Sequence, residues 1–194
     1  PEGDPAQGRF ISATGDEHIA FLGDGPRADT FMGALGEQTF ERAHFWTEAT
    51  VMTTFAGLTG LCAAVTLAGI FLRNRREFRQ TSIQGLMSLI QNIQAALWLT
   101  SMSLFAMWLS KTGDAANIMY GWPGPSLMIG EACAIVAALM TLITAVFLPA
   151  VWRGGRRVDS WTQVRKAGFT LTVAIYLSFS ALLLAWGAFE FWRG

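Results

Sequence analysis

Four long apolar runs constrain this chain more than any other feature of its sequence. They cover residues 47–72, 83–109, 125–148 and 167–190, and consist mostly of Leu, Ala, Val, Ile, Met, Phe and Trp. An α-helix of about 20 residues crosses a hydrocarbon core about 30 Å thick, so each run is long enough to span a bilayer. The sequence therefore predicts a membrane all-α fold, a four-transmembrane-helix bundle, in residues 47–194.

Composition favours this interpretation over a set of soluble core helices. Hydrophobic residues make up 52% of the chain and charged residues only 14%, which is typical of membrane proteins. The first run begins after residue 46, so a secretory signal peptide does not account for it. Because the chain begins with Pro1 and not with Met, we expect either processing or a longer parent protein.

Basic residues are concentrated in two loops that alternate with a nearly uncharged one. Nine of the 14 Lys and Arg residues lie in these two loops: Arg73, Arg75, Arg76, Arg79, Arg153, Arg156, Arg157, Arg165 and Lys166. The positive-inside rule places both basic loops in the cytoplasm. We expect a multi-pass protein of a bacterial inner membrane with both termini in the periplasm. Lipid headgroups are the expected contact of the arginines, and we expect no nucleic-acid partner.

Tryptophans flank the apolar runs at the level where amphipathic rings meet lipid headgroups. We interpret them as interface anchors, with a ligand-stacking site as the alternative. They are Trp46, Trp108, Trp122, Trp152, Trp161 and Trp192. Pro149 is expected to end the third span.

Small residues predict which helix faces pack together. Glycine and alanine let helix backbones approach closely in lipid, so their faces are expected inside the bundle. The small residues are Gly57, Gly60, Ala64 and Ala68 in the first run and Ala134, Ala137 and Ala138 in the third.

Three polar residues are candidates for contacts inside the membrane. Gln91 and Asn92 belong to a polar stripe on the second run, and unpaired amides are costly in hydrocarbon, so we expect bonds to neighbouring helices, with a functional role as the alternative. Glu131 is a carboxylate about two turns into the third run. It is expected to extend toward the outer surface, unless it marks a partner or a functional site.

The residues for several kinds of chemistry are missing. His18 and His44 lie outside the spans, so haem ligation across helices is excluded. Cys62 and Cys133 are single cysteines in separate runs and are interpreted as small core residues. We expect no catalytic residue, no cofactor and no metal site in this chain.

Residues 1–46 alternate short strand-like segments with turns and predict an extracytoplasmic antiparallel β meander of about four strands. A β segment of this size cannot bury a core alone. We expect an extracytoplasmic protein domain or other membrane subunits to cover it.

The order of meander, aromatic pair and membrane spans resembles the C-terminal region of membrane-anchored serine hydrolases of the β-lactamase-like family (CubicO and penicillin-binding-protein-like enzymes). The resemblance covers the whole chain in layout, and the residues that carry it are Phe10, 19–21, 23–25, 40–42, Phe45, Trp46 and 73–79. It implies a catalytic domain outside the membrane, tethered by the helix bundle.

The catalytic signature of that family is absent from this chain. No serine has a lysine three positions later, and Lys111-Thr112-Gly113 matches a family element only in a loop between spans. The resemblance implies a membrane-anchoring and docking region of a periplasm-facing serine hydrolase. The alternative is a small non-catalytic integral-membrane subunit that stabilises a larger complex.

Overall fold

The computed structural model describes residues 2–4, 9–11, 18–22, 30–32, 39–41, 45–71, 81–113, 124–153 and 161–189. The chain divides into two compact units, Pro1–Glu48 and Ala49–Gly194.

The first unit contains a five-stranded sheet. Its strands are β1 (Glu2–Asp4), β2 (Arg9–Ile11), β3 (His18–Leu22), β4 (Thr30–Met32) and β5 (Thr39–Glu41). Each strand pairs antiparallel with the next along the chain, in the order β1-β2-β3-β4-β5. The strand β1 has no counterpart among the expected segments, because Glu, Gly and Asp are all poor strand formers.

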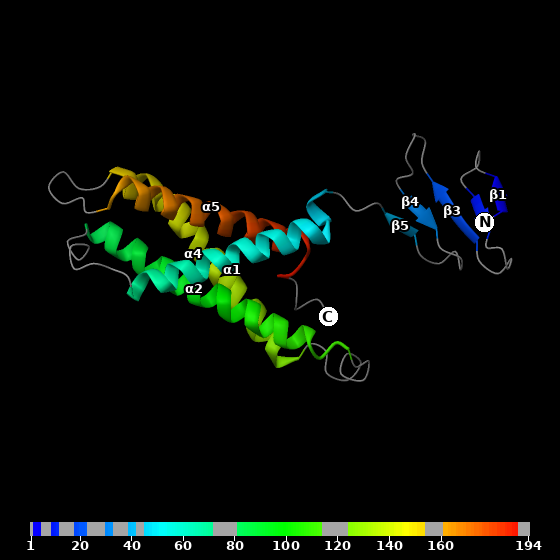
Figure 1. Ribbon diagram of the computed structural model, residues 1–194, viewed down its shortest axis with the longest axis horizontal. Coiled ribbons are helices and arrows are strands. Elements are labelled where there is room, and N and C mark those ends of the chain that lie inside the picture. The colour runs from blue at the N-terminus through cyan, green and yellow to red at the C-terminus, as the bar shows by residue number, and fades with distance from the viewer. Residues whose placement is uncertain are drawn as a thin grey trace. The chain divides into compact units, whose positions relative to one another are not determined.

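The second unit consists of four long helices, preceded by a short 3₁₀ turn, η1 (Phe45–Thr47) (Figure 1). The helices are α1 (Ala49–Phe71), α2 (Ser82–Leu109), α4 (Pro125–Arg153) and α5 (Gln163–Ala185). Three of them, α1, α4 and α5, are long and apolar enough to cross a membrane. The 28-residue α2 is also long enough, but its glutamines and its asparagine lower its mean hydropathy.

Local capping explains where two of the helices begin and one ends. Thr81 and Gln84 form a reciprocal capping box at the start of α2, and the Thr162 hydroxyl accepts a bond from the Arg165 amide at the start of α5. Past the end of α5, Gly187 has a φ of 70°. The amides of Gly187 and Ala188 donate to the carbonyls of Leu184 and Leu183, which is the Schellman arrangement.

Each helix packs against two neighbours, in the cyclic order α1-α2-α4-α5, and adjacent helices run antiparallel (Figure 1). The helices α2 and α5 therefore lie across a diagonal of the bundle. Two buried clusters fill its interior. One lies at the centre and includes Trp98 and Tyr176, and the other lies where α4 ends and α5 begins and includes Val151 and Trp161.

The expectation that Pro149 ends the third span is wrong, because α4 continues to Arg153. Proline removes one hydrogen bond to the carbonyl four residues earlier. Beyond Pro149, however, Val151 is completely buried in the second cluster. This packing favours one further helical turn.

Candidate functional site

The strongest candidate site is the buried polar and aromatic centre of the bundle. Gln94 on α2 is completely buried, as are Thr141 and Thr144 on α4. The Gln94 amide nitrogen donates to the Thr141 hydroxyl at 3.2 Å and to the Thr144 hydroxyl at 3.3 Å. Both threonines in turn donate to carbonyls of their own helix. A single amide therefore joins α2 to α4 through two side-chain hydrogen bonds.

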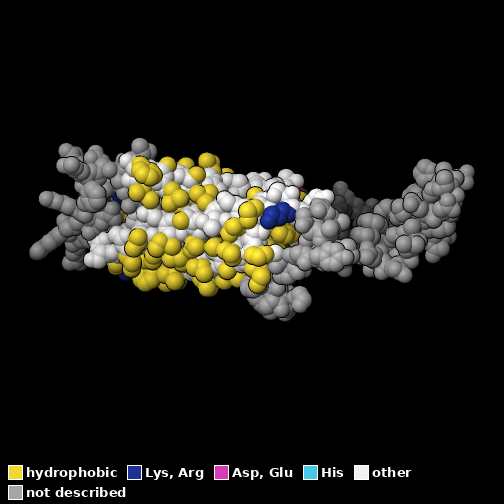
Figure 2. Space-filling view, turned by 90° about the horizontal axis from the view of Figure 1, so that it is seen from below, with side chains coloured by type: hydrophobic (Ala, Val, Ile, Leu, Met, Phe, Trp, Pro, Cys, Tyr) yellow, Lys and Arg dark blue, Asp and Glu magenta, His cyan; other side chains and the backbone are white. Residues whose placement is uncertain are grey.

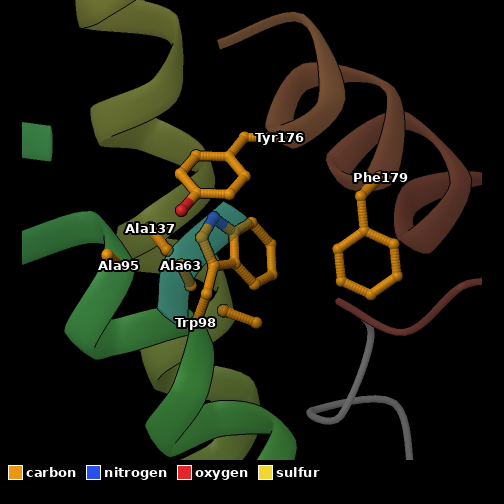
Figure 3. Close-up of a cluster of buried hydrophobic side chains, with 7 residues drawn as sticks. Ala63, Ala95, Trp98, Ala137, Tyr176 and Phe179 are labelled. Atoms are coloured by element: carbon orange, nitrogen blue, oxygen red, sulfur yellow. The ribbon is translucent and has the colours of Figure 1, made fainter. Parts of the chain in front are cut away.

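An aromatic group lies one turn further along α2. Trp98 and Tyr176 are completely buried and Phe179 is nearly so. The Trp98 ring centroid lies 6.0 Å from that of Tyr176 and 5.1 Å from that of Phe179 (Figure 3). Because Trp98 is on α2 and the other two rings are on α5, these contacts cross the diagonal of the bundle. The large rings fill the axis that the helix backbones leave open.

Several buried polar atoms make no hydrogen bond within the described part of the chain. Three of them belong to completely buried residues: Thr59 Oγ1, Gln94 Oε1 and Trp98 Nε1. Such atoms are costly in a protein interior and are uncommon in folded proteins. The centre of the bundle is therefore the place where the described helices leave polar groups to be satisfied.

A second polar group stabilises the junction of α4 and α5. Lys166 is only 3% exposed, and its ammonium donates to the Trp152 carbonyl at 3.3 Å. The Trp152 indole donates to the Thr170 hydroxyl at 2.9 Å, and the Arg165 guanidinium lies 4.2 Å from the centroid of the Trp161 ring. A cation at the carboxyl end of α4 also interacts favourably with the helix dipole.

The predicted polar contacts lie beside this centre and not in it. Gln91 and Asn92 are half-buried. Among the described residues, neither side chain forms a hydrogen bond to a neighbouring helix, and Asn92 Oδ1 is buried without a partner there. Gln94 forms the interhelical bonds instead. Glu131 is half-buried, and its Oε2 atom is buried without a hydrogen-bond partner in the described residues. The sequence interpretation expected Glu131 to extend toward the outer surface. In the structure, one of its two carboxylate oxygens is buried.

The predicted packing face of α1 is mostly wrong. Gly57, Ala64 and Ala68 are exposed, and only Gly60 packs inward, where a Cβ would lie 3.4 Å from the Met102 sulfur. In lipid both faces of such a helix can be apolar, so small residues alone do not identify the buried side. On α4 the expectation is confirmed for Ala134 and Ala137, which are buried.

The tryptophans predicted as interface anchors fall into four groups. Trp46 and Trp152 are exposed, Trp108 is half-buried, and Trp122 and Trp192 lie outside the described residues. Trp161 is only 4% exposed and packs edge-on against Phe169. Phe169 and Arg165 cover the Trp161 ring, so little of it is left to contact lipid headgroups.

The described residues hold no group of three or more His, Cys, Asp or Glu side chains that could bind a metal ion. Cys62 and Cys133 are free thiols and half-buried.

Sequence reasoning missed the residues at the centre of the bundle. Trp98 and Tyr176 lie in the middle of apolar runs, and the available signal was that each is an aromatic with a polar atom far from either membrane interface.

Comparison of the chain with protein-family models, with curated proteins and with solved structures finds no match.

Proposed function

We propose that residues 49–185 form a membrane anchor that holds the N-terminal β unit at the membrane surface. The proposal rests on one observation: polar side chains are buried between the helices, whereas large apolar side chains are exposed on the outside of the bundle. The interhelical bonds of Gln94, Thr141 and Thr144 are buried. Large apolar side chains are exposed on all four helices, and hydrophobic side chains cover much of the face that Figure 2 shows. This is the distribution that a helix bundle needs in lipid.

The same sorting supports α2 as a fourth membrane-crossing helix. Its buried polar residues, Gln84, Gln94 and Ser88, are at most 3% exposed. Its exposed side chains include Ile83, Leu86, Leu89 and Ile93, between 42% and 55% exposed. These three of the polar residues that lower the mean hydropathy of α2 are thus turned into the bundle, away from its outer surface. With four crossings, the positive-inside rule puts both basic loops in the cytoplasm and the β unit in the periplasm.

The test of the anchor is its partition between membrane and solution. We expect the protein to remain in the membrane pellet after extraction with alkaline carbonate and to dissolve only in detergent. Recovery in the carbonate supernatant would contradict the anchor, because peripheral proteins are released there and membrane-spanning proteins are not.

We further propose that this anchor is the docking region of a periplasm-facing serine hydrolase of the β-lactamase-like family. The support for that step is the resemblance in the layout of the chain. We expect the coding sequence upstream of Pro1 to contain an in-frame Ser-x-x-Lys motif, and the complete protein to be labelled by a fluorescent penicillin. An upstream region without that motif would refute the hydrolase and leave the anchor standing.

The second candidate is a non-catalytic subunit that stabilises a larger membrane complex. The short strands of the first unit favour a covering partner for either candidate, because strands of three to five residues bury little surface alone. Purification of the intact complex in mild detergent distinguishes the two. The subunit predicts a stoichiometric partner encoded by another gene, whereas the hydrolase predicts that the covering domain belongs to the same polypeptide.

A further inference from the structure

The register of the five-stranded sheet places its aromatic residues on one face. Phe21, Phe31 and Phe40 are directly opposite one another on β3, β4 and β5. Phe10 on β2 is directly opposite Ile19, which lies two residues before Phe21 on β3. Residues that are opposite each other, or two apart along a strand, share a face of the sheet. We call the face that holds these five residues the phenylalanine face.

The charged residues of the five strands all belong to the opposite face. Each of them is next to a residue of the phenylalanine face along its strand, or next to Gly3, which is opposite Phe10. They are Glu2, Asp4, Arg9 and Glu41. This separation of apolar and charged residues is typical of an antiparallel sheet that packs one face against a core.

The phenylalanine face needs a covering layer, and it is large enough for one stable interface. Among the described residues of the first unit, the only element besides the five strands is η1. A sheet with one hydrophobic face buries that face against another layer. Four phenylalanines that bury about 150–250 Å² each correspond to about 600–1,000 Å². A stable protein interface buries about 800 Å² on each partner.

The composition of residues 1–46 disfavours lipid as the covering layer. This segment contains eight acidic and three basic residues, and residues 1–45 contain no lysine, tryptophan or tyrosine. Segments that bind to a membrane surface are typically rich in Lys and Arg and carry aromatic anchors, and anionic lipids attract basic clusters. The composition therefore favours a protein layer.

A second copy of the chain supplies a layer with the same area and the same apolar character. In a β-sandwich, two sheets pack face to face about 10 Å apart. With two like faces in contact, no charged strand residue enters the interface, and neither sheet leaves apolar area uncovered. The helix bundle also confines every copy to one membrane, which raises the local concentration of like faces.

We propose that the phenylalanine face docks onto the same face of a second copy of this chain, so that two five-stranded sheets form a β-sandwich with two-fold symmetry. Because β3 is the middle strand, the two-fold axis passes near it. The inference goes beyond the anchor function, which one copy could perform alone. It leaves the charged face of each sheet to the larger domain or complex of either candidate function.

Cross-linking from β3 in isolated membranes tests the proposal. In a background with Cys62→Ala and Cys133→Ala, single cysteines are introduced as Ile19→Cys on the phenylalanine face and as Ala20→Cys on the opposite face. The reagent is a bifunctional maleimide whose spacer matches the sheet spacing of about 10 Å. We expect a covalent dimer of the chain from Ile19→Cys. We expect none from Ala20→Cys, because two sheets would then separate the thiols.

Three outcomes of this cross-linking would overturn the proposal. They are equal dimer yields at the two positions, no dimer at either, and a product from Ile19→Cys that contains a different protein. Each of them would leave the membrane anchor standing, because carbonate extraction tests the anchor separately.

A charge on the phenylalanine face tests whether that face makes the interface. Phe31→Glu would place a carboxylate in the apolar layer between the sheets, so we expect it to abolish the dimer that Ile19→Cys forms. Met32→Glu adds the same charge one residue later, on the opposite face, and should preserve that dimer. Equal dimer yields in the two variants would contradict the proposal. The comparison of Ile19→Cys with Ala20→Cys keeps its value even if Phe31→Glu unfolds the sheet.

Discussion

Trp98 on α2 and Tyr176 on α5 face each other across the diagonal of the helix bundle, with their ring centroids 6.0 Å apart. Their helices each pack mainly against α1 and α4. The aromatic pair is therefore a direct link between two helices whose backbones are not adjacent. Both side chains are completely buried, so the link lies at the centre of the fold.

The interhelical bonds of Gln94 should be measurable as a coupling energy. In a cycle that combines Gln94→Leu with Thr141→Val/Thr144→Val, we expect a coupling of about 0.6–1.7 kcal/mol, the range of hydrogen bonds between membrane helices. The measurement is the free energy of unfolding in mixed micelles titrated with sodium dodecyl sulfate. Gln91→Leu is the matched control and should show no coupling to the threonines. A coupling of zero for Gln94 would contradict the two bonds.

Two glycines of the spans should respond differently to the same substitution. A Cβ at Gly130 would lie 3.4 Å from both the Leu104 Cβ and the Ser101 carbonyl oxygen, whereas a Cβ at Gly57 has no neighbour within 4 Å. Because overpacking typically costs about 1–3 kcal/mol, we expect Gly130→Leu to lower the free energy of unfolding by that amount. Gly57→Leu should change it little. Equal losses would show that the Gly57 face is covered after all.

Lys166 should stabilise the junction of α4 and α5. Its ammonium donates to the Trp152 carbonyl in the last turn of α4, so Lys166→Met removes a charged hydrogen bond while it keeps the packed stem. We expect a loss of about 1–2 kcal/mol in the free energy of unfolding. Lys111→Met, at an exposed position after α2, should stay within about 0.5 kcal/mol of the unmodified protein. The prediction fails if the two variants are equally stable.

Glu131 should tolerate neutralisation. Its Oε2 atom is buried and forms no hydrogen bond to the residues that the structure describes. Glu131→Gln keeps the size of the side chain and removes a charge that is unfavourable near lipid. We expect the free energy of unfolding to fall by no more than about 0.5 kcal/mol. A larger fall would mean that the carboxylate has an ionic or hydrogen-bonding partner.

The helices were predictable from sequence because length and hydropathy are local properties. The four expected runs differ from the four helices by a few residues at most ends. The largest differences are at the ends of α4 and α5. At Pro149 the local rule ends the helix, whereas burial of Val151 extends it to Arg153. That burial depends on α2 and α5, which a local rule does not include.

The interior was less predictable, because lipid and protein core are both apolar. Gly57 and Gly130 look alike in sequence, yet one is exposed and the other buried. Asn92 and Gln94 are two residues apart and about 200° apart around the helix. Which of them bonds to α4 depends on which face α4 covers. The pairing of Trp98 with Tyr176 depends on the order of the helices in the bundle, and no local pattern encodes that order.

The crossing of α2 is the claim on which the membrane account depends most, and thiol labelling in intact spheroplasts tests it directly. In a background with Cys62→Ala and Cys133→Ala, single cysteines are introduced as Asn74→Cys before α2 and Lys111→Cys after it. We predict that a membrane-impermeant maleimide labels position 111 in intact spheroplasts and position 74 only after lysis. Labelling of both positions, or of neither, before lysis would contradict a helix that crosses the membrane between them.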